Sequence, residues 1–307
     1  MEALKAFAIL FLLGAVISPG ICAAAASRNN SSSTSITVAS AATSHADLIA
    51  FVDSAVAYAK ANGKDNAIKE FNNNKSTQFI KGELYIFAVD FNGTTIAHPY
   101  RPDFVGKSQM DLNDTNGVLF FKNMAIVAKR GNGSVYYVFA NPAHNKKPEL
   151  KLTYVEKVDD TWWLGAGTYL SNISANFSQA SRNNLTSFVD SAVNYAKEKG
   201  KDKALKEFNN KNGTFFKGGL YVFAYDFNGT TLAAPTQPNI IGTNRINVND
   251  PNGVKLIRDM DDIAKGGKGV TYYIYADPTK DMMQGLKLSY VEKVDDTWFL
   301  GAGIYAQ

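Results

Sequence analysis

Two repeated motifs have residue types that bind phosphate or metal ions in other proteins. Gly165-Ala-Gly167 and Gly301-Ala-Gly303 have the glycine spacing of a phosphate-binding loop, but such a loop must lead into a helix. Both lie in apolar runs typical of a terminal strand, so we interpret them as positions where another group packs closely. Asp159-Asp160 and Asp295-Asp296 have the residue types of paired acids, yet a two-Asp hairpin turn is the better interpretation.

A third motif is rich in side-chain oxygen atoms. Asp111, Asn113 and Asp114 are similar to the start of a calcium-binding loop. Counting from Asp111, however, Lys122 stands where an EF-hand places its bidentate Glu. We therefore expect these polar side chains to cap the helix that follows.

Catalytic chemistry has little support in this sequence. The chain has no Gly-x-Ser-x-Gly and no His-Glu-x-x-His motif. Three scattered His residues and one Cys leave no disulfide framework and no Cys-based zinc site. We predict no enzyme activity, no metal and no cofactor. Because 32 basic and 28 acidic residues give a net charge of +4 without a polybasic block, nucleic acid is not an expected partner.

The N-terminus indicates export from the cytoplasm. Residues 1–26 have a basic start, an apolar stretch at Ala6–Val16 and small residues before a candidate cleavage point, as in a secretory signal peptide. An uncleaved anchor is the alternative, although Ala6–Ile21 is shorter than the roughly 20 residues that span a bilayer. Cleavage would remove Cys22. The Ser/Thr/Asn-rich segment 27–45 predicts a flexible tether, so we expect an extracellular or cell-surface protein.

Eleven Asn-x-Ser/Thr sequons fit that location. A chain rich in Asn, Ser and Thr also makes sequons by chance, so we expect glycans on some of them only. The glycosylation candidates are Asn92, Asn132, Asn212 and Asn228.

The chain consists of one unit written twice. Phe51–Lys60 recurs as Phe188–Lys197, and Tyr154–Tyr169 recurs as Tyr290–Tyr305 with 14 of 16 residues identical. A spacing of 136 or 137 residues far exceeds the roughly 20–50 residues of solenoid repeats, so each copy is a whole domain. The expected boundaries are 46–171 for copy one, 172–183 for a linker and 184–307 for copy two.

Periodicity predicts the order of elements within a copy. In copy one it predicts helices at 47–61, with Ser44 as N-cap, and 65–71, strands at 84–90 and 94–98, a helix at 118–129, and strands at 134–140, 150–158 and 162–169. This order is typical of an α+β domain. We expect a five-stranded antiparallel sheet with a long N-terminal helix and a second, covering helix.

Several of these motifs together resemble a known family. Tyr154–Tyr169, the upstream strings Val89-Asp-Phe-Asn-Gly93 and Ala97-His-Pro99, and Asp111–Gly117 resemble the single-Cache type 2 domain along nearly all of each copy. The resemblance implies tandem PAS-like sheets of the kind that sense ligands outside the cytoplasm in chemoreceptors and sensor kinases. Because the sequence stops at Gln307, soon after the last strand, we expect no signalling domain of its own.

The resemblance also implies where a ligand binds. In the family a small polar or carboxylate ligand lies between the concave face of the sheet and the loop and helix above it. The implied ligand-binding residues are His98, Tyr100, Tyr137 and Lys151 in copy one, and Tyr273 and Lys287 in copy two. A Lys supplies charge for an anion, and a Tyr supplies a donor on a flat apolar body.

Alternatives remain open for these residues. Lys151 is equally well interpreted as a solvated strand end, and His98 as a surface residue. Of Tyr136 and Tyr137, we expect one to face the core and the other to face solvent. His98 is replaced by Ala234 in copy two, and if one copy alone binds, this pattern favours copy one.

Two hypotheses for function follow. The first is a secreted tandem Cache protein that binds a small polar or anionic metabolite, such as an organic acid, and presents it to a membrane receptor or surface partner. The second is a glycosylated cell-surface structural or adhesive protein that uses the fold without a ligand. The sequence leaves the oligomeric state and the identity of the ligand open.

Overall fold

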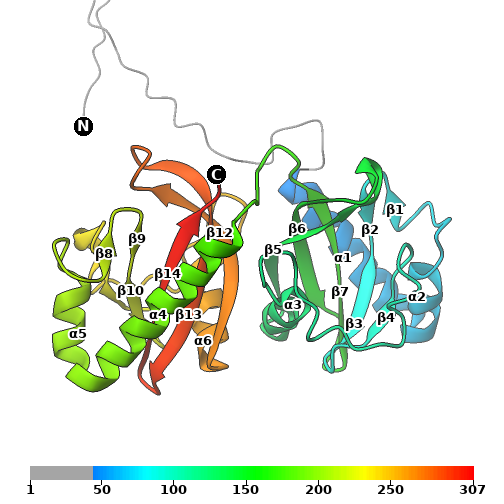
Figure 1. Ribbon diagram of the computed structural model, residues 1–307. Coiled ribbons are helices and arrows are strands. Elements are labelled where there is room, and N and C mark those ends of the chain that lie inside the picture. Colours follow the sequence, from blue (N-terminus) through cyan, green and yellow to red (C-terminus); the bar gives the residue numbers. More distant parts are fainter. Residues whose placement is uncertain (1–43) are drawn as a thin grey trace, which may run out of the picture. The chain divides into compact units, whose positions relative to one another are not determined.

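The computed structural model describes residues 44–307, in which two copies of one α+β unit follow each other along the chain (Figure 1). The predicted signal peptide and nearly all of the predicted tether lie outside the described residues. Each copy contains one five-stranded antiparallel sheet, which confirms the predicted fold class. None of the helices within residues 44–307 combines the length and the apolar character needed to span a bilayer.

The helices occur at equivalent places in the two copies. They are α1 (His45–Asn62), α2 (Lys64–Phe71) and α3 (Phe120–Lys129) in copy one, and α4 (Gln179–Lys199), α5 (Lys201–Phe208) and α6 (Leu256–Lys265) in copy two. Ser44 caps α1 as predicted, accepting a hydrogen bond from the Asp47 N–H at 3.1 Å. Because Ser178 caps α4 in the same way, α4 begins five residues before the expected boundary at 184.

The strands also correspond between the copies. Copy one contains β1 (Ile80–Lys81), β2 (Leu84–Tyr85), β3 (Phe87–Asp90), β4 (Thr95–Ala97), β5 (Asn132–Asn141), β6 (Lys147–Lys157) and β7 (Trp162–Tyr169). Copy two contains β8 (Phe216–Lys217), β9 (Leu220–Tyr221), β10 (Phe223–Asp226), β11 (Thr231–Ala233), β12 (Lys268–Asp277), β13 (Met283–Asp295) and β14 (Trp298–Tyr305). The strand expected at 84–90 is divided, because Leu84–Tyr85 pairs with β1 and the rest joins the main sheet.

Strand order and register place the candidate residues in a row. The sheets run β4-β3-β7-β6-β5 and β11-β10-β14-β13-β12. In copy one, Lys151 lies directly between Tyr137 on β5 and Tyr169 on β7. Directly opposed residues point to the same side of a sheet, so the fold itself sets a Tyr–Lys–Tyr row on one face.

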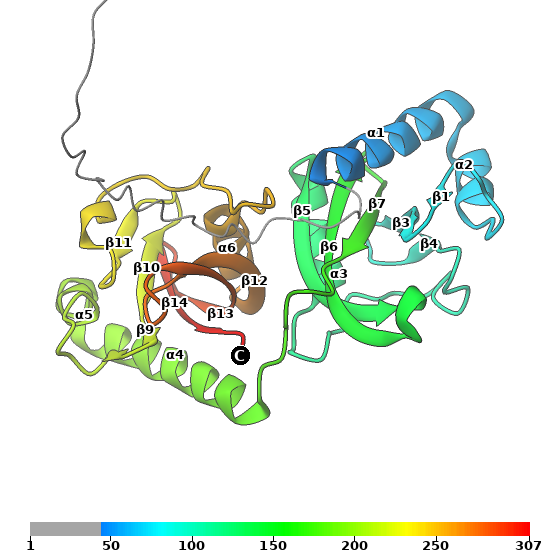
Figure 2. The same ribbon diagram turned by 90° about the horizontal axis from the view of Figure 1, so that it is seen from above.

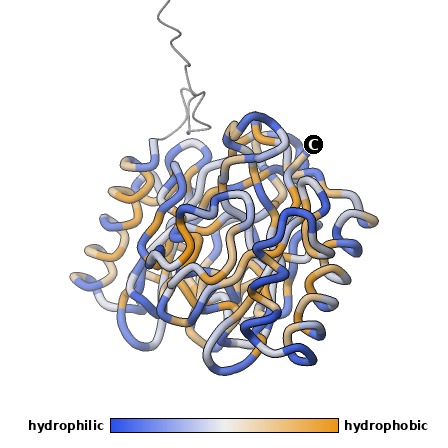
Figure 3. The backbone as a smooth tube through the Cα atoms, turned by 90° about the vertical axis from the view of Figure 1, so that its left-hand side faces the viewer, coloured by the Kyte–Doolittle hydropathy of each residue, from blue (hydrophilic) through white to orange (hydrophobic). Residues whose placement is uncertain are grey.

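The two faces of each sheet are covered differently. The first helix packs on one face, where α1 lies against β6 and β7 (Figure 2). The shorter helix α3 packs on the other face, where Phe121 and Met124 join the same cluster as Phe87 and Trp163. Hydrophobic residues gather on the strands and along one side of the helices, whereas the loops are mostly hydrophilic (Figure 3). The face under α3 and α6 is the one that carries the Tyr–Lys–Tyr row.

Two interpretations of acidic motifs have opposite outcomes. The Asp159 side chain accepts hydrogen bonds from the Thr161 N–H at 2.7 Å and the Trp162 indole at 3.0 Å, which confirms the turn. The expectation that Asp114 helps to cap α3 is wrong, because Leu119 is the N-cap residue and no side chain caps it. Asp114 instead accepts from the backbone N–H of Val118 and of residues further away in sequence.

Candidate functional site

Copy two contains a cavity of ≈ 30 Å³ between the sheet and α6. The sheet side is lined by Tyr221, Phe223, Tyr225, Tyr273, Tyr275 and Lys287, the helix side by Leu256, Ile257 and Met260, and the mouth by Ala234, Thr236, Gln237 and Ile240. Such a volume holds about two water molecules. A larger guest therefore requires the loop at the mouth or α6 to move outward.

Lys287 supplies the charge in this cavity. It is 1 % exposed, and its Nζ donates to the Tyr221 hydroxyl at 3.0 Å and lies 5.0 Å from the centre of the Tyr305 ring. Within residues 44–307, no carboxylate lies within ion-pair distance of this ammonium. Aromatic faces offset part of the cost of burying a cation, but a buried charge ordinarily has a counter-ion. The site is therefore short of one negative charge.

The tyrosine beside Lys287 responds to that charge. Burial by itself would raise the pKa of Tyr221, but the Lys287 charge and hydrogen bonds from Lys287 and Thr236 outweigh burial and lower it. A hydroxyl in this position is a strengthened donor toward any anion that enters. Lys287 and Tyr221 thus lie together as two hydrogen-bond donors for an anion in the cavity.

A glycine makes room for the buried lysine. A Cβ at Gly303 would lie 2.5 Å from Cε of Lys287, and a Cβ at Gly167 would lie 2.8 Å from Cε of Lys151. At Gly165, a Cβ would lie 2.7 Å from the Tyr154 carbonyl oxygen. These contacts confirm that the Gly-x-Gly motifs are positions of close packing. They allow each lysine stem to lie flat across the neighbouring strand.

Lys151 in copy one is equally buried, so the alternative of a solvated strand end is wrong. It is 1 % exposed and donates to the Tyr85 hydroxyl at 2.8 Å. Burial lowers the pKa of Lys151 to about 7, against a small opposing effect of Glu83. Near neutral pH the Lys151 amine is therefore only partly protonated.

Copy one packs large rings on the sheet face that carries Lys151. Phe120 stacks on Tyr137 with centroids 4.5 Å apart, and Phe121 and Phe104 pack beside it. Copy two has smaller residues at these places: Leu256, Ile257 and Ile240 replace Phe120, Phe121 and Phe104, and Ala234 replaces His98. At one position copy two has the larger side chain, because Tyr225 replaces Val89. The smaller side chains thus leave room for the cavity in copy two.

His98 has a structural role in copy one. It is 5 % exposed, which excludes the surface alternative, and its Nδ1 accepts from the Arg101 N–H at 3.0 Å. Burial, followed by the charges of Lys151 and Arg101, lowers the pKa of His98 to about 3. A neutral His98 holds the loop above the sheet and brings no charge for an anion.

The remaining tyrosines are in different surroundings. Tyr137 is buried and its hydroxyl accepts from the Thr153 hydroxyl at 3.1 Å, whereas Tyr100 is 43 % exposed at the rim. In copy two the Tyr273 hydroxyl is 2.8 Å from the Ser289 hydroxyl. The expectation that one of Tyr136 and Tyr137 faces solvent is wrong, because Tyr136 is also buried and donates to Asp250 of copy two.

Two tyrosines beside each lysine were missed by sequence reasoning. Tyr85 and Tyr169 surround Lys151, as Tyr221 and Tyr305 surround Lys287. Each of these tyrosines is repeated at the same offset as the lysines, and that shared offset was the available signal.

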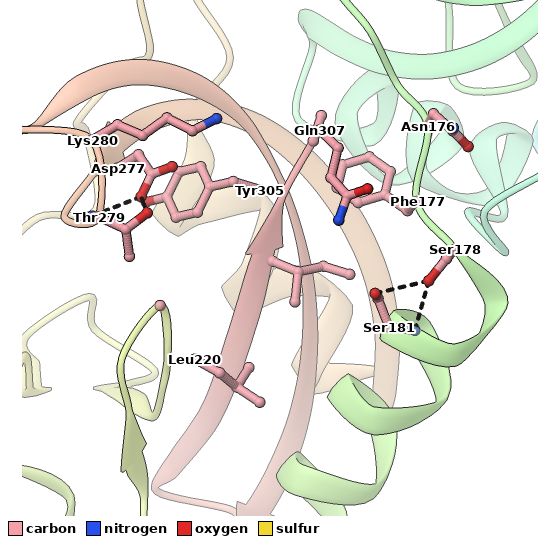
Figure 4. A pocket seen from close by; sticks show the side chains of 13 residues that line it. Asn176, Phe177, Ser178, Ser181, Leu220, Asp277, Thr279, Lys280, Tyr305 and Gln307 are labelled. Atoms are coloured by element: carbon pink, nitrogen blue, oxygen red, sulfur yellow. Dashed lines mark hydrogen bonds between the residues drawn. The ribbon is translucent and has the colours of Figure 1, made fainter.

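A larger hollow of ≈ 290 Å³ lies elsewhere in copy two, where the start of α4 meets Leu220, Tyr305 and the last residues of the chain (Figure 4). Its polar side chains already bond to one another, as with Asp277 to Thr279 and Ser178 to Ser181. Its buried charged side chain, Asp277, already accepts two hydrogen bonds from Thr279, so the smaller cavity at Lys287 is the better candidate.

Comparison with known proteins places this geometry in a family. A family model described as a Cache domain matches residues 52–307. The sensor histidine kinase MctS of Rhizobium johnstonii is 32 % identical over 127 residues, which is 40 % of this chain and 27 % of the kinase. The chain thus spans about a quarter of the length of that relative.

Solved structures of sensor domains are also similar. A methyl-accepting chemotaxis protein from Vibrio parahaemolyticus is 26 % identical over 41 % of this chain and 88 % of that one, with a TM-score of 0.36. A Cache chemosensory domain, solved to explain carboxylic acid recognition, is 23 % identical over 42 % of this chain and 95 % of that one, with a TM-score of 0.37. Since the family match extends across both copies, this chain belongs to the Cache-domain family of extracytoplasmic sensor modules.

Proposed function

We propose that copy two binds a small organic anion, such as a short carboxylic acid, against Lys287. The observation that carries the proposal is a buried ammonium that lines a cavity and that has no carboxylate within ion-pair distance among the residues that the structure describes. A bound carboxylate would provide the missing counter-charge and accept hydrogen bonds from Lys287 and Tyr221. Charge-assisted hydrogen bonds of this kind are roughly twice as strong as neutral ones.

The mouth of the cavity limits the size of the ligand and the way it enters. The Tyr275 hydroxyl donates to the Gln237 side chain at 3.2 Å, and both residues line the cavity. A ligand that replaces this bond would itself be contacted by Tyr275 and Gln237. We therefore propose a metabolite of few heavy atoms, held under a loop that opens for entry.

Copy one has the same framework with less capacity for an anion. Its large rings pack on the sheet face that carries Lys151, and the lowered pKa of Lys151 weakens its charge near neutral pH. We propose that copy two is the main binding domain and that His98, Tyr137 and Lys151 chiefly stabilise copy one. This reverses the preference for copy one suggested by the sequence.

The proposed setting is the exterior of the cell, where the chain would present its ligand to a membrane receptor or surface partner. The four glycosylation candidates, Asn92, Asn132, Asn212 and Asn228, are all exposed, as an acceptor site requires. A glycosylated surface protein without a ligand remains the alternative. The exposed glycosylation candidates fit a ligand-binding protein and a surface protein without a ligand equally well. Ligand binding therefore has to be tested directly.

Thermal unfolding of the full chain in the presence of acetate, lactate, pyruvate or succinate tests the proposal. At 100 times its dissociation constant a ligand adds about 2.7 kcal/mol to stability, which raises the melting temperature by several degrees. Lys287→Met keeps the chain length and removes the charge, and we expect it to abolish the shift. The matched variant Lys151→Met should retain it.

Two outcomes would count against this assignment. An equal shift in wild type and Lys287→Met would remove Lys287 from the site. The absence of any shift with the four acids, and with a further panel of amino acids and amines, would favour the surface-protein alternative.

A further inference from the structure

Copy one reaches into copy two through Tyr136 on β5. This tyrosine is buried, and its hydroxyl donates to Oδ2 of Asp250 at 3.0 Å. The same hydroxyl accepts from Nδ2 of Asn252 at 2.8 Å. Its donor and one acceptor position are therefore both used by the other copy.

Copy two makes the equivalent contact with copy one through Tyr272 on β12. The Tyr272 hydroxyl donates to Oδ2 of Asp114 at 2.9 Å and accepts from Nδ2 of Asn116 at 2.7 Å. Each of these residues is offset by 136 from its counterpart. A contact in which residue i meets j while the equivalent of j meets the equivalent of i is the mark of a two-fold interface.

Each acceptor is also bonded within its own copy. Asp114 also accepts from the Val138 N–H of its own copy at 2.9 Å, and Asp250 accepts from the Ile274 N–H at 3.0 Å. Both carboxylates are 7 % exposed. A buried acceptor with a fixed orientation makes the geometry of the incoming tyrosine specific.

The first helix of each copy extends the matched contact. Arg182 at the start of α4 donates to Oδ1 of Asn116 at 3.1 Å. His45, the equivalent residue on α1, lies so close to Gly253 that a Cβ there would be 2.6 Å from the His45 ring. The position is shared, but the residues differ, so the two-fold relation is only approximate.

One group of charges breaks the symmetry entirely. Arg130, the residue after α3, donates to Oδ1 of Asp259 and Oδ2 of Asp262 on α6, each at 2.5 Å. The counterparts of these residues are uncharged, since Gly266 corresponds to Arg130, Asn123 to Asp259 and Ile126 to Asp262. The charge pairing therefore exists in one direction only.

This asymmetry distinguishes the three conceivable pairings. Two copies of the first domain would leave two Arg130 side chains without carboxylates. Two copies of the second domain would bring the four carboxylates of Asp259 and Asp262 together without Arg130, and Lys265, 3.8 Å from Asp262, is already bonded to Asp261 at 2.6 Å. Unpaired charges at a partly buried surface are strongly unfavourable, so copy one with copy two is the one pairing in which all of these charges are matched.

We infer that the surface between the copies is a two-fold dimer interface carried within one chain, and that Arg130 selects copy two as the partner of copy one. The copies then bind each other as a 1:1 pair without the covalent linker. This inference does not depend on the ligand proposed for Lys287.

The test uses the full chain with a protease recognition sequence inserted after Asn172, which is exposed. After cleavage, size-exclusion chromatography with light scattering measures which species remain at micromolar and lower concentrations. We expect the two fragments to elute together with the mass of a 1:1 pair. Separate elution of two monomers, or of two homodimers, would overturn the inference.

Charge variants in the cleavable chain test the role of Arg130. Arg130→Glu should weaken the pair by about tenfold or more, because it places like charges together. Lys129→Glu makes the same change of charge at the adjacent, exposed residue and should leave the pair intact. Arg130→Asp combined with Asp262→Arg should recover part of the lost affinity.

A conservative variant guards against loss of folding. Tyr272→Phe removes one hydroxyl and leaves Asp114 and Asn116 without their partner, so it should weaken the cleaved pair several-fold while circular dichroism stays unchanged. Equal affinities for Arg130→Glu and Lys129→Glu in folded protein would show that Arg130 does not select the partner.

Discussion

Copy one and copy two hold the same lysine among the same tyrosines, but they surround it with side chains of different size. Lys151 and Lys287 occupy equivalent register positions between two tyrosine-bearing strands. Copy one has the paired rings of Phe120 and Phe121 on this face, whereas copy two has the smaller Leu256 and Ile257, which line a cavity with Lys287.

The difference shows which part of the site the fold determines. Strand register sets the Tyr–Lys–Tyr row, so both copies keep it. Whether a ligand has room depends on a few residues on α3 or α6 and on the covering loop, and these have diverged. The shared framework and the divergent surroundings can therefore be tested separately.

The largest effect is expected where the framework is tightest. Gly303→Ala and Gly167→Ala each place a Cβ within 2.8 Å of a lysine Cε, and overpacking of this kind costs about 1–3 kcal/mol. We expect similar losses of about 3 kcal/mol in the free energy of unfolding, measured in urea. A large difference between the two variants would show that the lysines are held differently.

The second prediction concerns the pH dependence of stability. The pKa of Lys151 is about 7 in the folded chain and near 10.4 when unfolded. Between these values the unfolded chain binds more protons, so stability rises with pH by up to about 1.4 kcal/mol per pH unit. From pH 7 to pH 9 we expect a contribution of about 2 kcal/mol.

Variants isolate that contribution from other titrating groups. Lys151→Met should lack the rise between pH 7 and pH 9 in urea unfolding, whereas Lys287→Met should keep it. Parallel pH profiles for wild type and Lys151→Met would mean that the lysine is not desolvated in copy one.

The smallest effect on stability comes from exchanging the surroundings. Leu256→Phe with Ile257→Phe gives copy two the rings of copy one, and we expect stability to change by about 1 kcal/mol or less, since new contacts offset strain. The increase in melting temperature produced by the carboxylic acid ligands should disappear, because the cavity is filled. A retained shift would place the ligand outside this cavity.

The reciprocal exchange is the control. Phe120→Leu with Phe121→Ile removes ring contacts from Tyr137 and should cost about 2 kcal/mol. It should also open space beside Lys151, detectable as a new shift with acetate in a chain that carries Lys287→Met.

Local patterns in the sequence predicted the architecture well. Period-two runs located the three long strands, and Ser44 marked the start of the first helix as observed. The resemblance pointed to Tyr273 and Lys287, which line the cavity. These features depend on side chains near each other in sequence or on repeated positions, which one sequence reveals.

The sequence-based predictions that were wrong involve residues whose contacts are distant in sequence. Tyr136 was expected to compete with Tyr137 for the core, but its hydroxyl bonds to a carboxylate 114 residues away. Asp114 was expected to act on the next helix, but its Oδ2 accepts from the distant Val138 N–H and Tyr272 hydroxyl. Likewise, Phe104, Phe121 and Tyr137 come from three separate segments of copy one and pack in one cluster. No local periodicity predicts such a contact.

The carboxylates of Asp114 and Asp250 have a consequence for solubility. Strands β5 and β12 are the outermost strands of their sheets, and an unpaired outer strand invites another chain to add a strand and aggregate. By accepting from the Val138 and Ile274 N–H groups, these carboxylates occupy one backbone donor on each of these outermost strands, which also contact each other. A buried acid at the edge of a sheet also repels an incoming backbone carbonyl, so the same two side chains protect the protein against edge-to-edge assembly.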